Sequence, residues 1–220
     1  MSDKEASRSM APPGMVLGTF ITFEGCEGSG KTTQAMMLRD YMVSRGKEVV
    51  LVREPGGTPL GLKIRDLLLD PASGKISPIT EALLFAADRA QQVRDVIRPA
   101  LQIGQVVISD RFVDSSLAYQ GVARGCGLEP VKNLNDWATG GLEPHLTVFL
   151  EMPVKDSLAR AEQHGLDRIE KEKLEFHENV RNAYRMLQLV YSYRYVTVDA
   201  TGTPERVRDR VVGEVEKIIV

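Results

Sequence analysis

The residues best suited to chemistry begin at Gly25, where a glycine, four residues and then Gly-Lys-Thr follow one another. This segment comes after an apolar run and opens a helix-like pattern, as phosphate-binding loops do. Its glycines allow a tight turn whose backbone amides point at phosphate oxygens, and the helix N-terminus adds positive potential. Lys31 would contact the β- and γ-phosphates of a nucleoside triphosphate, and Thr32 would bind Mg²⁺. The alternative is an ordinary glycine-rich turn. The predicted triphosphate site comprises Gly25, Cys26, Glu27, Gly28, Ser29, Gly30, Lys31, Thr32 and Thr33.

A charged pair, Asp110 and Arg111, follows a second apolar run at residues 106–108. An aspartate at the end of a buried strand can hold Mg²⁺ directly or through water, and the adjacent arginine can bind an acceptor phosphate. A surface salt bridge is the alternative, although the ligand edge of a sheet is a poor place for one. No glycine stands at the Asp-x-x-Gly position of a GTPase switch, and no Asn-Lys pair occurs in the sequence. The pattern therefore favours a kinase over a switch protein.

These residues need a scaffold, and five apolar, β-rich runs alternate with helix-like stretches. Such alternation predicts βαβ units around a parallel sheet, and nearly continuous apolar strands predict helices on both faces. Ligands of such sheets bind at the carboxyl ends of the strands. The expected strands are residues 20–23, 49–52, 106–108, 146–150 and 195–198.

Helix boundaries and two irregular segments can also be predicted. The first helix should run from Lys31 to about Arg45, because Met37, Leu38, Tyr41 and Met42 fall on one stripe. We expect another helix from Ser77-Pro78 to Gly104, and a last one from Thr203-Pro204-Glu205 onward, each opened by a capping residue and a proline. Residues 53–59, rich in Gly and Pro, and the charged residues 163–173 are predicted to be loops at the functional end.

Composition limits the remaining possibilities. The 220 residues are 43% hydrophobic, which suits one domain, expected over residues 15–220. Residues 1–14 are polar and contain proline, as in a disordered leader or a non-native remnant. The net charge of −2 argues against a nucleic-acid partner and an anionic membrane surface. Only two cysteines occur, and no apolar run reaches the roughly 20 residues of a membrane span. A cytoplasmic location is therefore predicted.

From about Gly18 to the C-terminus, the sequence resembles the bacterial thymidylate kinases. The resemblance implies the three-layer α/β fold of P-loop NTPases, with a five-stranded parallel sheet and a short lid at about residues 160–173. It implies a homodimer and the reaction of ATP with dTMP to give ADP and dTDP for dTTP synthesis, with Mg²⁺ bridging the ATP phosphates. The segments that carry the resemblance are residues 23–33, Arg-Glu-Pro-Gly-Gly at 53–57, Asp-Arg-Phe at 110–112, Ser-Ser-Leu-Ala-Tyr-Gln-Gly at 115–121 and Asp-Arg-Ile-Glu at 167–170.

The resemblance also assigns the base site. Phe85 and Arg89 lie four residues apart, on one face of a predicted helix. In the family the matching phenylalanine stacks on thymine and the matching arginine hydrogen-bonds to it, whereas spacing alone would equally fit a core aromatic at Phe85. Ser116 and Gln120 match polar residues near the base edge. Tyr119 matches a residue beside the deoxyribose, where bulk disfavours a 2′-hydroxyl.

The phosphate side of the acceptor follows from the same resemblance. Arg65 matches an arginine that grips the acceptor phosphate together with Arg111, although by itself it would be taken for a solvated helix charge. Glu27 lies inside the phosphate-binding loop, where a carboxylate needs a task because it would repel phosphate. In the family this acid approaches the sugar 3′-hydroxyl and metal-bound water. Lys31, Arg111, Glu27 and a lid arginine are the expected catalytic residues.

The lid arginine is the least determined residue. Some relatives carry a catalytic arginine at the position of Gly28, so this chain should take its arginine from the lid. Arg160 and Arg168 are the candidates, and Arg168 is preferred for contact with the transferring group; the alternative is a solvent-exposed run of charge. Two rival functions stay open: another P-loop kinase, of the deoxynucleoside or shikimate type, and a nucleotide-binding switch or module.

Overall fold

A five-stranded parallel sheet forms the centre of the computed structural model, which describes residues 17–163 and 165–219. The expected leader at residues 1–14 lies outside the described residues, as do residues 15, 16, 164 and 220 of the predicted domain. The strand order is β2-β3-β1-β4-β5, and every neighbouring pair is parallel. Each strand begins where the sequence predicted and ends one or two residues later: β1 Phe20–Glu24, β2 Val49–Arg53, β3 Val106–Asp110, β4 Leu146–Glu151 and β5 Tyr195–Asp199.

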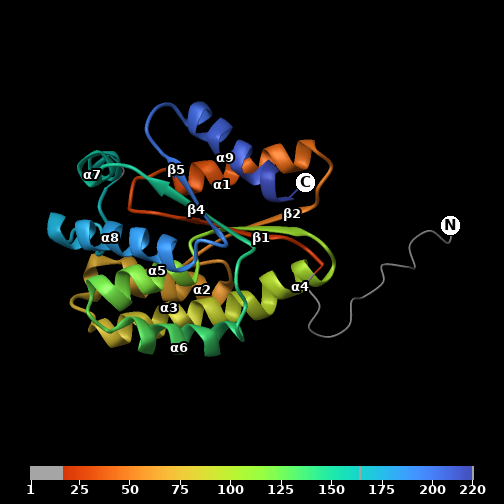
Figure 1. Ribbon diagram of the computed structural model, residues 1–220. Helices are drawn as coiled ribbons and strands as arrows, with labels where there is room; N and C mark the ends of the chain where they lie inside the picture. Colours follow the sequence, from red (N-terminus) through yellow and green to blue (C-terminus); the bar gives the residue numbers. More distant parts are fainter. Residues whose placement is uncertain (1–16, 164, 220) are drawn as a thin grey trace.

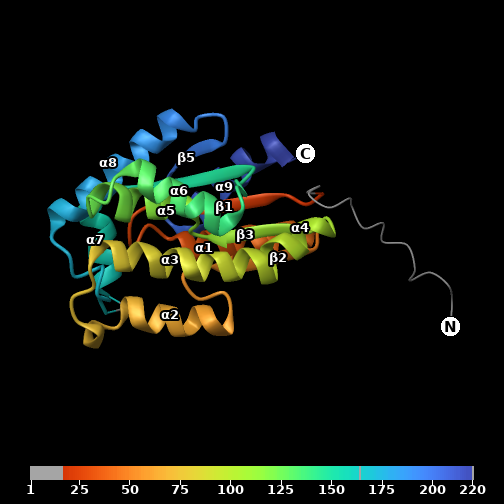
Figure 2. The same ribbon diagram turned by 90° about the horizontal axis from the view of Figure 1, so that it is seen from below.

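Helices cover both faces of the sheet, which confirms the predicted three-layer α/β fold (Figure 1). α1 (Lys31–Ser44) and α9 (Pro204–Ile219) pack on one face, and α4 (Arg98–Gln102) and α8 (Leu174–Val190) pack on the other. α2 (Pro59–Leu69) packs on the outer side of α3, away from the sheet (Figure 2). The other helical segments are η1 Pro71–Ser73, α3 Pro78–Gln92, the π-helical turns η2 Val93–Ile97 and η3 Leu117–Ala123, α5 Val113–Ser116, α6 Leu128–Thr139 and α7 Val154–Glu162.

The predicted helix boundaries are confirmed. The Ser77 hydroxyl caps α3 by accepting a hydrogen bond from the Thr80 amide at 3.2 Å. The helical path continues through η2 and α4 and ends before Gly104, which has a φ of +83°. The π-helical turn precedes Pro99, which has no amide hydrogen to donate to the helix. Across the described residues, no helix combines the length and apolar character that a bilayer span requires.

The core consists of apolar side chains on both faces of the sheet. Leu38 and Met42 of α1 and Val211 of α9 pack on one face against strand residues such as Ile21. Because the sheet is buried on both faces, its strands are held rigidly, and the loops at their carboxyl ends have a fixed platform.

Candidate active site

One cavity of about 790 Å³ opens at the carboxyl ends of the strands. Part of its wall comes from the loop between β1 and α1 and from the N-terminal end of α9. The side chain of Gln34 in α1 connects these two parts by donating a hydrogen bond to the Pro204 carbonyl at 2.9 Å. Other parts come from α2, α3, α5, η3 and α7, and from the loops after β2, β3 and β5 and before α8. The cavity is thus continuous from the predicted triphosphate loop to the predicted acceptor residues, as the topology rule for parallel sheets requires.

The loop between β1 and α1 has the geometry expected for phosphate binding. Gly30 has a φ of +91°, which suits glycine, and α1 begins at the next residue, so the helix N-terminus faces the cavity. The Lys31 ammonium lies under the loop and donates to the Cys26 carbonyl at 2.7 Å. Burial, reinforced by the nearby Arg111, lowers the pKa of Lys31. Cys26 itself is buried beneath the loop, and burial raises the pKa of its thiol to about 11, so it is a poor nucleophile.

One residue at the start of α1 and one at the end of β3 together fit a magnesium ion. The Thr32 hydroxyl donates a hydrogen bond to the Asp110 carboxylate, which brings the two predicted metal residues together. Within the described ranges no cluster of three or more His, Cys, Asp or Glu side chains could hold a metal by itself. Magnesium in phosphate-transfer sites is commonly held by one or two protein groups together with substrate phosphates and water. Thr32 and Asp110 match that donor set.

The phosphate-binding loop packs closely against α7 at Gly28. The φ of Gly28 is +70°, and a β-carbon there would lie 2.0 Å from the carbonyl oxygen of Ser157. The Ser157 hydroxyl donates to the Glu27 carbonyl, which ties the same helix to the loop. No side chain, and therefore no arginine, can occupy position 28 without displacing α7. This packing places Arg160, one turn further along α7, at the cavity wall.

Arg111 is held at the junction of the two predicted sites. Its backbone adopts a left-handed conformation with φ +75°. Its guanidinium pairs with the Glu27 carboxylate at 2.5 Å and donates to the Ser115 hydroxyl at 3.0 Å. The Tyr119 hydroxyl donates to the other oxygen of Glu27 at 2.9 Å. Burial tends to raise the pKa of Glu27, but Arg111 and Lys31 outweigh it and lower that pKa to about 2. Glu27 is therefore ionised at any physiological pH.

A buried carboxylate supports Arg111 from below. Glu24 accepts hydrogen bonds from the Phe112 amide at 2.8 Å, the Ser115 hydroxyl at 2.6 Å and the Tyr184 hydroxyl at 2.8 Å. Because Ser115 also accepts from Arg111, Glu24 holds both the backbone after Arg111 and a partner of its side chain. Burial, together with the charge of Asp114, raises the pKa of Glu24 to about 7.

Most residues predicted for the acceptor line the cavity, but Arg89 does not. Arg89 is only 1% exposed and lies behind Ser116, to whose hydroxyl it donates at 2.9 Å. It also pairs with Glu54 at 2.5 Å. In this arrangement Arg89 can act on a base only through Ser116, whereas Phe85 borders the cavity directly. The predicted acceptor residues that line the cavity are Glu27, Arg65, Phe85, Arg111, Ser116, Tyr119 and Gln120.

The two candidate lid arginines lie in different places. Arg160 lines the cavity, and its guanidinium is 3.5 Å from the carbonyl oxygen of Ala200. Arg168 does not line the cavity, since its guanidinium donates to the Leu68 carbonyl at 2.7 Å and to the Glu81 carboxylate at 2.6 Å. The preference for Arg168 stays a prediction, and it requires that this guanidinium leave Glu81.

Several cavity residues were not singled out by sequence reasoning. Asp167 and Glu170 line the cavity, and both belong to the Asp-Arg-Ile-Glu segment, which was a signal for them. Ala200 and Gly202 line it from the loop after β5. The rule that ligands bind at the carboxyl ends of parallel strands could have identified that loop, because β5 is one of the predicted strands.

A phosphate-binding loop before α1, a parallel sheet and a second, arginine-rich wall define the class of P-loop α/β nucleotide-binding proteins. The sequence model of the thymidylate kinase family matches residues 23–211, and the chain belongs to that family. It is 49% identical over 196 residues to a thymidylate kinase of Desulfovibrio desulfuricans, covering 86% of this chain and 90% of the relative. It is 47% identical over 204 residues to one of Lactobacillus helveticus, covering 91% and 96%. The crystal structure of thymidylate kinase from Ehrlichia chaffeensis matches with a TM-score of 0.76 at 30% identity, over 90% of this chain and 98% of that one.

Proposed function

We propose that this protein transfers the γ-phosphoryl group of ATP to dTMP and forms ADP and dTDP. The observation that carries the proposal is a continuous cavity in which the phosphate-binding loop faces a wall with two arginines, Arg65 and Arg111, in a chain of the thymidylate kinase family. Phosphoryl transfer depends mainly on positioning two anionic groups and neutralising their charge. A cavity with a phosphate-binding loop on one side and two arginines on the other supplies both the positioning and the charge neutralisation.

On the donor side, the backbone amides of the loop would hold the phosphates and Lys31 would neutralise the β- and γ-oxygens. Thr32 and Asp110 would hold Mg²⁺, which supplies charge neutralisation between those oxygens. Glu27, whose pKa is about 2, stays anionic beside the acceptor. Its charge is balanced by Arg111, so the loop can still accept phosphate.

On the acceptor side, Arg65 and Arg111 would clasp the phosphate of dTMP. Arg65 is oriented by donating to the Pro55 carbonyl at 2.9 Å. The attacking phosphate oxygen is already ionised near neutral pH, so the reaction needs no strong general base. Phe85 would stack on thymine, and Tyr119 would crowd a 2′-hydroxyl. Ser116, positioned by Arg89, and Gln120 would contact the base edge.

A lid at residues 160–173, on a single domain from residue 15 to 220, would complete the site. Closure would bring an arginine to the transferring group and exclude water. Arg160 is favoured by its place at the cavity wall, and Arg168 is the alternative. A homodimer in the cytosol is also proposed. It is supported by exposed apolar side chains on the adjacent helices α2 and α3, namely Leu60, Leu67, Ile79 and Leu83.

A substrate panel tests the proposal. ATP and Mg²⁺ are supplied with dTMP, dUMP, dCMP, dGMP, thymidine or shikimate, and ADP release is measured. We expect dTMP to be the preferred acceptor. Preference for thymidine or shikimate would indicate one of the rival kinases, and tight ATP binding without turnover of any acceptor would indicate a binding module.

A further inference from the structure

Glu81 is a buried carboxylate on which four hydrogen-bond donors converge. It lies on α3 one turn before Phe85 and is 1% exposed. Its carboxylate accepts from the Gln120 side-chain amide at 2.9 Å, from Arg168 at 2.6 Å and from Arg124 at 3.2 and 3.4 Å. Glu81 does not line the cavity, whereas Gln120 does. The carboxylate is therefore placed to act on a ligand through Gln120.

The chemistry of these groups fixes the orientation of the Gln120 amide. An ionised carboxylate can only accept hydrogen bonds, so it binds the NH₂ end of the amide and rejects the oxygen end. Arg124 and Arg168 are obligate donors, and they balance the charge of Glu81 without competing for that NH₂ group. The carbonyl oxygen of Gln120 is the end that is left for a ligand in the cavity.

We propose that Glu81 is a positioning residue that sets base specificity by holding Gln120 with its acceptor oxygen toward the nucleobase. The inference rests on the proposed function. Thymine carries a hydrogen on ring nitrogen N3 and can donate it to this oxygen. Cytosine has a lone pair at N3, so two acceptors would face each other, and one buried acceptor would be left unpaired. Through Glu81 the enzyme prefers a pyrimidine that donates at N3.

The test compares dTMP with 5-methyl-dCMP, which keeps the methyl group and differs at N3 and at the 4-position. In Glu81→Gln the new amide can donate as well as accept, so Gln120 is free to turn its NH₂ group toward the base. We expect the ratio of kcat/KM for dTMP to that for 5-methyl-dCMP to fall about 10- to 100-fold, with the change mainly in the KM of the acceptor. Arg124→Met is the matched control: it removes a partner of Glu81 but leaves the Gln120 contact, so the ratio should stay near the wild-type value.

A double-variant cycle separates positioning from general damage. If Glu81 acts through Gln120, Glu81→Gln should not change the ratio further in a Gln120→Met background. An unchanged ratio in Glu81→Gln, or an equal fall in Arg124→Met, would overturn the inference. Failure of the wild type to phosphorylate dTMP would instead overturn the proposed function.

A structure of the wild-type protein with dTMP gives an independent test that needs no variant to fold. The Gln120 amide should bridge the Glu81 carboxylate and thymine N3, each within hydrogen-bond distance. A thymine N3 bonded to any other group would contradict the role assigned to Glu81, whatever the variants show.

Discussion

The two halves of the cavity are built in different ways. The phosphate-binding part of the donor half is one continuous segment, residues 25–33, and it offers backbone amides and a lysine whose ammonium contacts a main-chain carbonyl. The acceptor half is assembled from side chains of α2, α3, α5, η3 and the loop after β3. Phosphate recognition by a backbone loop therefore needs only local sequence, whereas recognition of a particular nucleoside needs the tertiary fold.

Charge is also handled differently in the two halves. Around the acceptor, guanidinium groups are paired with carboxylates: Arg111 with the partly buried Glu27, and Arg89 with the fully buried Glu54. Removing one partner of a buried pair leaves the other uncompensated, which costs more than the pair contributes. Variants in the acceptor half should therefore affect both stability and substrate affinity, whereas Lys31 can be changed with less structural damage.

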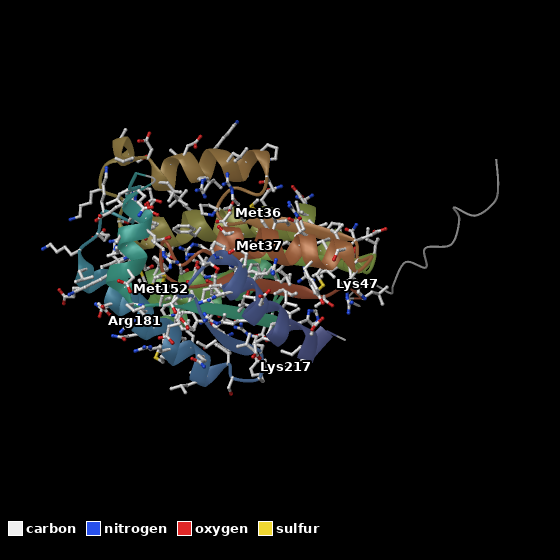
Figure 3. The ribbon with its side chains drawn as sticks, turned by 90° about the horizontal axis from the view of Figure 1, so that it is seen from above. Met36, Met37, Lys47, Met152, Arg181 and Lys217 are labelled. Carbon is white, nitrogen blue, oxygen red and sulfur yellow. The ribbon has the colours of Figure 1, made fainter. Side chains whose placement is uncertain are left out.

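The largest effect is expected for Lys31→Met. Loss of the ammonium that neutralises the transferring phosphates should lower kcat about 1,000-fold, while the melting temperature and the KM for dTMP change little. Steady-state kinetics with ATP, Mg²⁺ and dTMP measures this. Lys47→Met is the matched control, because Lys47 is exposed and lies at the far side of the molecule from α7 (Figure 3). A Lys31 variant whose loss is entirely in the KM for dTMP would break the distinction between the two halves.

The same contrast explains what the sequence could and could not predict. The phosphate-binding loop and all five strands follow from local spacing and apolar runs, and the capping of α3 by Ser77 follows from two adjacent residues. Contacts between residues far apart in the chain cannot be predicted in this way, since no local pattern connects Glu81 with Arg168. The resemblance named Arg89 as a base contact, but only the packed structure places it behind Ser116.

An intermediate effect is expected in the lid, where Arg160 and Arg168 are the two candidates for the catalytic arginine. Arg160→Met should lower kcat about 100-fold, because Arg160 already borders the cavity next to the donor half. Arg168→Met should lower it less than about tenfold, since that guanidinium is engaged by Glu81. Single-turnover rates with bound ATP and dTMP distinguish the two. The opposite order of effects would support the sequence-based preference for Arg168.

The smallest effect, and the sharpest test of how the acceptor half is supported, is the pH dependence that Glu24 imparts. Its pKa of about 7 means that above this pH the carboxylate accepts from Phe112, Ser115 and Tyr184. Below it the protonated group must donate one of these bonds, which loosens the hold on Arg111. We expect Glu24 to contribute a threefold to tenfold fall in kcat/KM for dTMP between pH 8 and pH 6. Glu24→Gln resembles the protonated form and should lack this contribution.

The dTMP phosphate also titrates in this range, with a pKa near 6, so the ratio of wild-type to variant kcat/KM is the quantity to plot. That ratio should rise as the pH increases through about 7. The stability of the fold should change in the opposite sense. The pKa of Glu24 in the folded protein lies above the ordinary glutamate value of 4.5, so the native state binds more protons between these two values, and the contribution of Glu24 to stability falls as the pH rises. A kinetic ratio that is flat from pH 6 to 8 would show that Arg111 is positioned independently of Glu24.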